Sequence, residues 1–524
     1  MRETEQFVLP LWAAVVVALC AGPILDAGFP DKGIWPLTFV GIGLILFAIR
    51  GRSVGGALLT GLVAGLSFYF THIAWAALFL GPLPMTALST LESLFVALGS
   101  AAIALAYRWV PRALPTVLAR LTVLPATVAG LWTAREAWSA VWPYGGFAWG
   151  RVALSQSESP FASLFSLLGI SGVSFVMVLV VALVLELLRL SDVARLTRAT
   201  IAVGALAALL AIPAWPVSTS GSIDVLAVQG NGKAGYFDER EQGDLLQSQL
   251  DATLERLGEN ADVVVWPEGS ADINPLEEPF AASAFDFVAD SFDAPLISGV
   301  ITSEGDDYFN SSLLWLPEEG ASDVYNKRHP IPFGEYIPDR AFWRPFAPEL
   351  IDLVQRQYTP GTTDGVMDIG KAMVGVNICF DIVDDDLLYE TVRDGSEVIF
   401  AQSNNADFGR TDESEQQLAI ARIRALELGR SVVNISTVGT SAIIAPDGST
   451  ISQLEWYTAG SMLEAVPLSN SVTPALVASR AIEWTVSGMS LLVLVMAGLG
   501  VRADRKSRLE PSSLKALNPP RGRV

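Results

Sequence analysis

The chain has 524 residues, of which 51% are hydrophobic and 17% are charged, and its net charge is −21 at pH 7. Its mean hydropathy of +0.42 excludes a wholly soluble protein, and its acidity argues against nucleic acid as a partner. Residues 219–470 hold 43 acidic and 14 basic side chains, whereas the rest of the chain holds 12 acidic and 20 basic ones. This distribution predicts a membrane protein with one acidic soluble domain.

Apolar stretches long enough to cross a bilayer, which takes about 17–25 residues, occur repeatedly along the chain. They lie at 7–27, 33–50, 54–80, 84–108, 122–141, 161–189, 198–217 and 482–502. The first lacks the basic start and the small-residue cleavage site of a signal peptide, so we interpret it as a helix. The sequence therefore predicts a seven-helix membrane domain over 1–218, and an eighth helix with a basic tail within 471–524.

Basic residues follow every second predicted span, which fixes the expected orientation. On that side lie Arg50, Arg52, Arg108, Arg112, Arg120, Arg189, Arg195, Arg198, Arg502, Arg505, Lys506 and Arg508. The opposite loops offer little beyond Lys32 and Arg151. Because basic loops stay in the cytoplasm, we expect both termini inside and the soluble domain on the outer face.

Residues 219–470 change to alternating strand and helix patterns. The predicted strands are 223–229, 262–268, 294–300, 311–317, 373–379, 397–403, 431–437 and 440–446, and the clearest helices are 239–257 and 414–429. Buried strands that alternate with helices over about 250 residues predict one α/β domain.

Three predicted strand ends carry chemically useful side chains: Glu268 after DVVVWP, Lys327 after VYN, and Cys379 after VGVNI. Glu335 and Asp381 follow the second and the third. Open α/β folds gather their sites at such strand ends. A carboxylate, an ammonium group and a thiol are what acyl transfer through a thioester needs, since they supply a base, an oxyanion partner and a nucleophile.

Each of these residues alone also has an ordinary structural interpretation. Cys379 fits a small buried hydrophobe as well as a nucleophile, and Glu268 and Lys327 fit a loop carboxylate and a surface charge. The chain has only two histidines, so neither a Cys–His nor a Ser–His–Asp mechanism has a convincing base. We interpret His329 as a turn residue and His72 as a packing or hydrogen-bonding residue within a span. Two histidines and one accessible cysteine also argue against a zinc site.

The order of these residues and their flanking motifs resemble the Glu-Lys-Cys triad of the nitrilase (carbon–nitrogen hydrolase) superfamily. The motifs are WPEGS, YNKRHPIPFGEYIP, ICFD and ARIRALELGR. With the eight-span frame, they resemble the apolipoprotein N-acyltransferase family over nearly the whole chain. The resemblance implies an α-helical membrane domain joined to an extracytoplasmic α/β nitrilase-like domain, an α-β-β-α sandwich.

The resemblance also implies roles. Cys379 would take an acyl chain from a phospholipid as a thioester, Glu268 would be the general base, and Lys327 would stabilise the oxyanion. Glu335 would orient or balance Lys327. Phe380 and Asp381 stand where the family often has tyrosine and glutamate, and would support the nucleophile.

Three aromatic residues are candidates for contact with lipid or substrate: Phe237, Tyr144 in WPYGGFAWGR (142–151), and Trp343 in the apolar loop 341–354. The loop 451–460 is a second apolar candidate. The family's usual tryptophan and histidine are replaced by Asp407 and Gln417, which puts lipid or acceptor preference in doubt.

The resemblance implies a monomeric enzyme of the bacterial cytoplasmic membrane that needs no metal or organic cofactor. Its donor would be a membrane phospholipid and its acceptor the amino terminus of a diacylated apolipoprotein. Two rival functions stay open. One is a membrane-tethered amidase whose acceptor is water, and the other is a non-catalytic scaffold for a polyprenol-phosphate glycosyltransferase.

Overall fold

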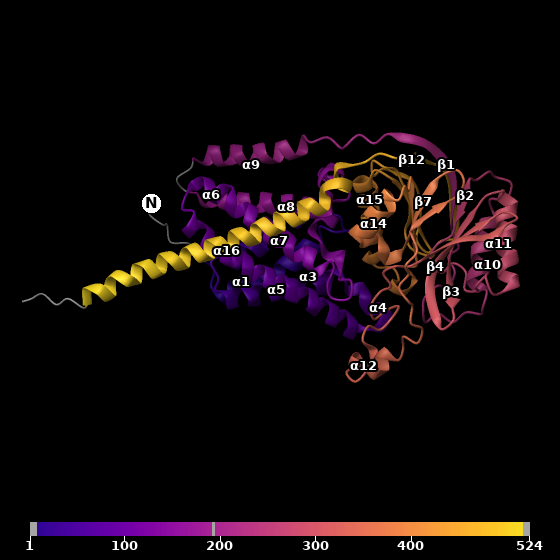
Figure 1. Cartoon of the computed structure of the whole chain (residues 1–524), viewed down its shortest axis with the longest axis horizontal. Coiled ribbons are helices and arrows are strands. Elements are labelled where there is room, and N and C mark those ends of the chain that lie inside the picture. The colour runs from indigo at the N-terminus through magenta and orange to yellow at the C-terminus, as the bar shows by residue number, and fades with distance from the viewer. Residues whose placement is uncertain (1–7, 191–193, 517–524) are drawn as a thin grey trace, which may run out of the picture.

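The computed structural model describes residues 8–190 and 194–516, and side chains as far as residue 504. It has a helical part and a sheet-containing part, which lie end to end (Figure 1). The basic residues expected after Arg502 lie outside the described side chains.

The helical part is a bundle of apolar helices. Its main members are α1 (Leu11–Asp26), α2 (Pro36–Ile49), α3 (Val54–His72), α5 (Pro82–Ala113), α7 (Val123–Ser139), α8 (Phe165–Arg189), α9 (Arg195–Leu210) and α16 (Pro474–Ala516), with α4 (Ala77–Leu80) and α6 (Val117–Leu121) as short connections. Five of the described helical segments are long and apolar enough to cross a membrane: Val54–His72, Pro82–Ala113, Val117–Ser139, Ala162–Arg189 and Pro474–Asp504. α1 and α2 are shorter apolar helices.

Helix α9 lies where the seventh span is predicted, but it is shorter than the apolar run suggests. Only Arg195–Leu210 is helical, and none of its side chains is buried. It runs along the outside of the bundle beside α8 (Figure 1). Arg195 and Arg198 lie in its first turn, which shortens the apolar part of the helix. The count of seven spans before the soluble domain therefore stays a prediction.

The other part of the chain contains two six-stranded sheets. The first has the order β12-β1-β2-β3-β4-β5 and the second the order β11-β10-β9-β8-β7-β6. Their strands are β1 (Thr219–Gln229), β2 (Val263–Val265), β3 (Leu296–Glu304), β4 (Asp307–Leu316), β5 (Gly320–Asn326), β6 (Val366–Asp368), β7 (Met373–Ile378), β8 (Val398–Ser403), β9 (Ser431–Ser436), β10 (Ser441–Ile444), β11 (Thr450–Leu454) and β12 (Gly460–Ser469).

Helices cover the outer face of each sheet, which gives the expected α-β-β-α sandwich. Side chains of both sheets share one apolar core, with Val225 and Val376 among its members. α10 (Asp244–Leu254) and α11 (Pro279–Phe292) cover the first sheet. α14 (Asp385–Arg393) and α15 (Asp412–Leu428) cover the second and lie against the helical bundle (Figure 1). Two further short helices, α12 (Arg340–Trp343) and α13 (Pro348–Ile351), project beside α4.

All eight predicted strands are present, whereas β5, β6, β11 and β12 have no counterpart among them. All four are edge strands of their sheets, where exposed polar positions weaken the apolar pattern. Strand β11 also changes the interpretation of loop 451–460. Ile451 and Leu454 pack against the core between the sheets, so this end of the segment is part of the sandwich.

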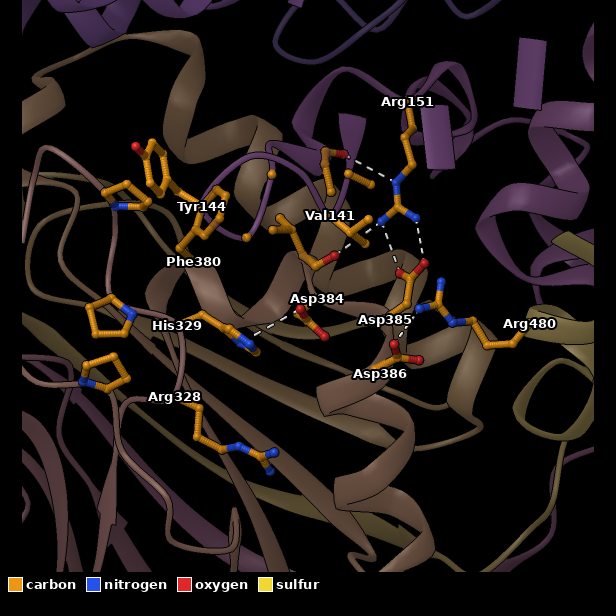
Figure 2. Close-up of a pocket in the computed structure, with 18 of the residues that line it drawn as sticks. Val141, Tyr144, Arg151, Arg328, His329, Phe380, Asp384, Asp385, Asp386 and Arg480 are labelled. Atoms are coloured by element: carbon orange, nitrogen blue, oxygen red, sulfur yellow. Dashed lines mark hydrogen bonds and ion pairs between the residues drawn. The ribbon is translucent and has the colours of Figure 1, made fainter. Parts of the chain in front are cut away.

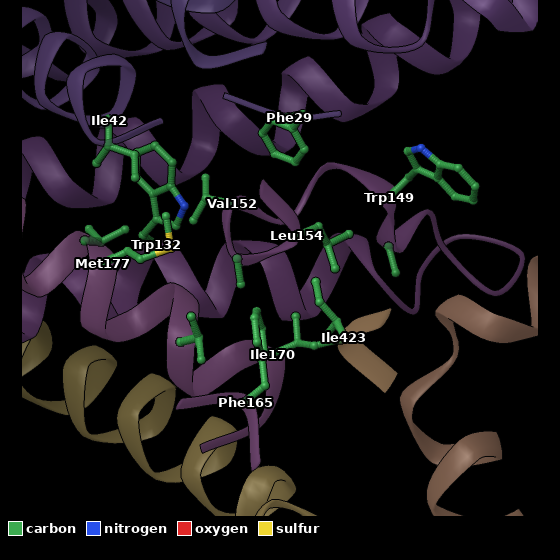
Figure 3. Close-up of a cluster of buried hydrophobic side chains, with 14 of the residues drawn as sticks. Phe29, Ile42, Trp132, Trp149, Val152, Leu154, Phe165, Ile170, Met177 and Ile423 are labelled. Carbon is green, nitrogen blue, oxygen red and sulfur yellow. The ribbon is translucent and has the colours of Figure 1, made fainter. Parts of the chain in front are cut away.

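The outer helical layer and the bundle share a continuous core. Figure 3 shows Ile423 of α15 beside Ile170 and Leu154 of the helical part. All residues of α15 from Glu413 to Leu428 except Glu415 are buried, which explains its mixed sequence: one side meets the sheet and the other meets the bundle. The two parts are thus packed together through α15.

A buried ion network crosses the same boundary. Arg151, in the loop that follows α7, lies 2.6 Å from Asp385, and Arg424 of α15 lies 2.7 Å from the same carboxylate. Arg424 also pairs with Glu427 at 2.6 Å, and Glu427 accepts the N–H of Ile170 at 3.2 Å. Burial opposes ionisation of Asp385, but Arg151 and Arg424 outweigh it and hold its pKa well below the usual value.

We expect Arg424→Met to lower the free energy of unfolding by about 3–5 kcal/mol, because it leaves the buried Glu427 without its cation and removes one of the two cations that face Asp385. Thermal unfolding in detergent measures the change. Arg344→Met is the matched control, since Arg344 forms a 2.7 Å ion pair with Asp352 on the surface. That control should leave thermal stability close to that of the wild type, because an exposed ion pair contributes little. Equal losses in both variants would contradict a structural role for the network.

Candidate active site

The polypeptide turns sharply at Cys379, where β7 ends and a 3₁₀ helix (Cys379–Val383) begins. Cys379 has φ +51°, in the left-handed region that residues other than glycine rarely adopt. Such strain is typical of positions where the surrounding structure holds a functional side chain. The turn directs the thiol out of the buried strand, and the side chain is only partly buried.

Asp381 holds this turn in place. Its carboxylate is fully buried and accepts N–H bonds from Ile378 at 3.2 Å and His329 at 3.2 Å, and the hydroxyl of Tyr325 at 2.8 Å. Asp381 therefore holds the turn through the backbone, with the backbone N–H of His329 among its partners, and its support of a nucleophile stays a prediction.

Glu268 and Lys327 follow strands of the first sheet, and their side chains meet near Cys379, at the end of β7 in the second sheet. Glu268 follows β2 and Lys327 follows β5. Lys327 Nζ lies 2.8 Å from Glu335 Oε2 and 3.5 Å from Glu268 Oε1. Glu268 and Cys379 lie near enough for each to shift the pKa of the other, so the structure brings all four predicted residues together. Lys327 has three N–H directions and two carboxylates face it, which leaves one donor for a ligand.

Asn310 of β4 joins the two carboxylates. Its Nδ2 donates to Glu268 Oε1 at 2.7 Å and to Glu335 Oε1 at 2.8 Å. The sequence analysis missed this residue, because an asparagine within an ordinary strand pattern carries no signal of its own. Its two hydrogen bonds hold both carboxylates at the ammonium group of Lys327 and stabilise their charged forms.

Close backbone approach also positions the two charges. A Cβ at Gly299 would lie 2.6 Å from Glu268 Cα, and one at Gly361 would lie 2.0 Å from the carbonyl oxygen of Asn326. Gly361 N–H donates to Lys327 O at 2.8 Å. Only glycine allows the chain this near to the two segments.

Protonation states follow from burial and from the neighbouring charges. Burial, aided by Glu268, raises the pKa of Cys379 well above its usual value, although Lys327 opposes this. Burial also raises the pKa of Glu268, which Lys327 partly offsets. Burial opposes the charge on Lys327, but Glu335 and Glu268 outweigh it and raise its pKa well above the usual value. The resting site thus holds a thiol that needs a base, next to a carboxylate suited to accept its proton.

The Phe380 ring packs against the helical part of the chain. It lies parallel to those of Phe147 and Trp149, with centroids 6.1 Å from each. It also lines a cavity of about 220 Å³ between the two parts of the chain, together with Tyr144, His329 and Asp384. Figure 2 shows this cavity, with Arg151 and Arg480 on its far side.

The three aromatic candidates for lipid contact lie on two sides of the site. Tyr144 donates to Asp339 at 2.8 Å and accepts from Trp343 Nε1 at 3.4 Å, so these two candidates touch one another. Phe237 is 53% exposed and packs against Phe79, with ring centroids 6.1 Å apart. None of the three contacts Cys379, and their roles in binding stay predictions.

A second group of polar residues lies behind the thiol. Gln417 Nε2 lies 3.9 Å from Cys379 Sγ, and Gln417 Oε1 accepts from Asn405 Nδ2 at 2.7 Å. Asn405 Nδ2 also donates to Glu413 Oε2 at 2.8 Å. The sequence analysis identified Gln417 only as a departure from the family pattern, and it missed Glu413 and Asn405. Among the described residues, no group of three or more His, Cys, Asp and Glu could hold a metal ion.

Glu413 makes stability depend on pH. Burial is the main cause that raises its pKa to about 8. The folded protein therefore binds this proton between the usual glutamate pKa and about pH 8, whereas the unfolded chain does not, so stability falls as pH rises through that window. We expect Glu413→Gln to flatten the decline, with a gain over wild type of about 2–4 kcal/mol at pH 8. Thermal unfolding at pH 5 and pH 8 measures it. Parallel curves for the two proteins would contradict a protonated Glu413.

Comparisons with known proteins define first the class and then the family. Residues 227–472 match the carbon–nitrogen hydrolase family model, and residues 21–183 match the model of the apolipoprotein N-acyltransferase N-terminal domain. The sheet-containing part is thus a carbon–nitrogen hydrolase domain joined to a helical membrane domain. An apolipoprotein N-acyltransferase of Mycolicibacterium smegmatis is 30% identical over 94% of this chain and 85% of its own length. The chain therefore belongs to the apolipoprotein N-acyltransferase family.

Other proteins are also similar to this chain. The apolipoprotein N-acyltransferase of Shewanella oneidensis is 26% identical over 88% of this chain and 91% of its own length. Among solved structures, an amidase from Nesterenkonia sp. is 15% identical, covering 51% of this chain and 97% of its own, with a TM-score of 0.39.

Proposed function

We propose that the protein transfers a fatty acyl chain from a membrane glycerophospholipid to the N-terminal amine of a diacylated apolipoprotein, through a thioester on Cys379. The observation that carries the proposal is the pairing of Lys327 with Glu268 and Glu335 beside the thiol, in a domain packed against helices of bilayer length. The names of its relatives support the acceptor class.

The first half-reaction forms the thioester. Glu268 takes the proton of Cys379 while the sulfur attacks the ester carbonyl, and the oxyanion that develops lies against the ammonium group of Lys327. When the tetrahedral intermediate collapses, the C–O bond breaks. Glu268 returns the proton to the departing oxygen of the lysophospholipid, so the acyl group stays on sulfur and the base is free again.

The second half-reaction transfers the acyl group to nitrogen. A neutral amine attacks the thioester, its N–H proton passes to Glu268, and the C–S bond breaks. Glu268 then returns the proton to the sulfur, which regenerates the thiol. The products are an amide and free Cys379, and Lys327 again faces the oxyanion of the intermediate.

Apolar side chains near the site support a lipid donor. Leu78, Phe237, Phe342 and Phe346 are 58%, 53%, 59% and 72% exposed. Leu78 lies on α4, Phe237 on the segment before α10, and Phe342 and Phe346 on α12 and just after it. Figure 1 shows α4 and α12 at the end of the helical bundle. Exposed apolar groups gathered around one site are typical of contact with a membrane.

We also propose that the catalytic domain faces outward from the cytoplasmic membrane. Arg50 and Arg120 both pair with the buried Glu186, and Arg108 donates to the carbonyl oxygen of Arg52 at 2.7 Å. The predicted cytoplasmic loops therefore gather at one end of the bundle, which supports this topology.

The test uses purified protein in detergent with phosphatidylethanolamine and a synthetic diacylated lipopeptide that has a free amino terminus. We expect the lipopeptide to gain one acyl group by mass and an N-acetylated lipopeptide to stay unchanged. Release of free fatty acid without peptide acylation would favour the amidase. No reaction of donor or acceptor would favour the scaffold.

A further inference from the structure

Groups of the membrane domain form hydrogen bonds with both the oxygen and the nitrogen of one buried amide in the catalytic domain, that of Gln416. Gln416, in the first half of α15, is 3% exposed. Its Oε1 accepts from Trp149 Nε1 at 2.6 Å and from Trp75 Nε1 at 3.2 Å. Its Nε2 donates to the carbonyl oxygen of His72 at 3.3 Å. All three partners belong to the membrane domain.

These contacts fix the orientation of the Gln416 amide. An indole N–H is a donor only, so the oxygen must face Trp75 and Trp149 and the nitrogen must face His72. The partners are themselves held. His72 Nδ1 lies 3.1 Å from Asp26 Oδ1, and the ring of Trp149 lies parallel to that of Phe380, the residue after the nucleophile.

The next residue in the chain, Gln417, faces the nucleophile. Neighbours in sequence point in different directions from a helix, so Gln416 reaches the membrane domain while Gln417 reaches Cys379. Because Asn405 Nδ2 donates to Gln417 Oε1, the Nε2 group is the one that faces Cys379 Sγ, at 3.9 Å. An N–H in this place stabilises the thiolate relative to the thiol.

We propose that Gln416 is a positioning residue, through which Trp75, Trp149 and His72 of the membrane domain hold Gln417 on Cys379 Sγ. The inference rests on the proposed role of Cys379 as nucleophile. It makes the reactivity of the thiol depend on how the membrane domain packs against α15, a dependence that a soluble domain of this fold would lack.

The test measures how alkylation of Cys379 by iodoacetamide varies with pH, in full-length protein in detergent, with intact mass as the readout. Cys20→Ser is the background, so that a single cysteine remains. We expect Gln417→Met to move the midpoint of the profile upward by about 0.5–1 pH unit, since it removes the N–H at the sulfur. Gln416→Met should give a similar shift without touching Cys379.

Two further variants separate positioning from general destabilisation. The double variant Gln416→Met, Gln417→Met should shift the midpoint no further than Gln417→Met alone, because both changes act on one contact. Gln249→Met is the matched control, since Gln249 is equally buried but bonds Val228 O in the first sheet. It should lower thermal stability and leave the midpoint in place.

The proposal would be overturned if Gln416→Met kept the wild-type midpoint while Gln417→Met shifted it, or if the double variant gave the sum of two shifts. A shift in Gln249→Met equal to that of Gln416→Met would also overturn it. A wild-type Cys379 that resists alkylation at every pH would instead overturn the nucleophile assignment, which distinguishes the two failures.

Discussion

Cys379→Ser is expected to lower the rate of lipopeptide N-acylation by about 10⁴-fold or more, the loss that follows removal of a catalytic nucleophile. The serine hydroxyl is a far weaker acid than a thiol, so a carboxylate such as Glu268 activates it far less well. The site therefore loses its covalent route. Rates are measured by the mass of the lipopeptide, with protein in excess to detect slow turnover.

Cys20→Ser is the matched control, because it makes the same chemical change on α1 in the membrane domain. It should retain wild-type turnover. Activity above about one tenth of wild type in Cys379→Ser would contradict a covalent intermediate on this residue. General acid–base catalysis, which contributes about 10²–10⁴-fold without any nucleophile, would then account for the rate.

Lys327→Met is expected to lower acyl transfer by about 10²–10³-fold, as the loss of one oxyanion partner does in other acyl-transfer enzymes. The effect should fall on both half-reactions, because each passes through an oxyanion. Single-turnover formation of the acyl-enzyme and its discharge by lipopeptide measure the two steps separately.

The same change has a second consequence that must be separated from catalysis. Without the Lys327 cation, the two carboxylates of Glu268 and Glu335 repel one another in a buried site. One of them is therefore expected to stay protonated. Lys327→Arg keeps the charge and serves as the fold control. Lys371→Met removes an exposed lysine that pairs with Asp262, and should leave both steps unchanged. A Lys327→Met protein that is folded and fully active would contradict the oxyanion role.

The grouping of Glu268, Lys327, Cys379 and Glu335 could be predicted, because the first three follow strands and Glu335 stands in the same long motif as Lys327. Asn310 could not, since its role exists only where β4 lies beside the ends of β2 and β5. Gln416 was equally hidden. Its partner His72 is 344 residues away in the chain, and no local pattern reveals a contact between a membrane helix and α15.

The limits of the pattern are also visible in single elements. Apolar runs predicted a full span at 198–217, whereas the helix covers Arg195–Leu210, because composition does not show where a helix ends before Pro213. Edge strands such as β11 were missed, since their partly exposed faces dilute the alternation. The interior strands, where both faces are buried, were all predicted, with bounds that differ from the observed ones by up to four residues.

The thioester on Cys379 is the central claim, and intact-mass measurement after mixing with phospholipid tests it most directly. Wild-type protein should gain the mass of one fatty acyl group, and should lose it when diacylated lipopeptide is added. The adduct should be absent from Cys379→Ala. A wild-type protein that acylates the lipopeptide in a single turnover without ever carrying the acyl mass, or an adduct that persists in Cys379→Ala, would contradict the account.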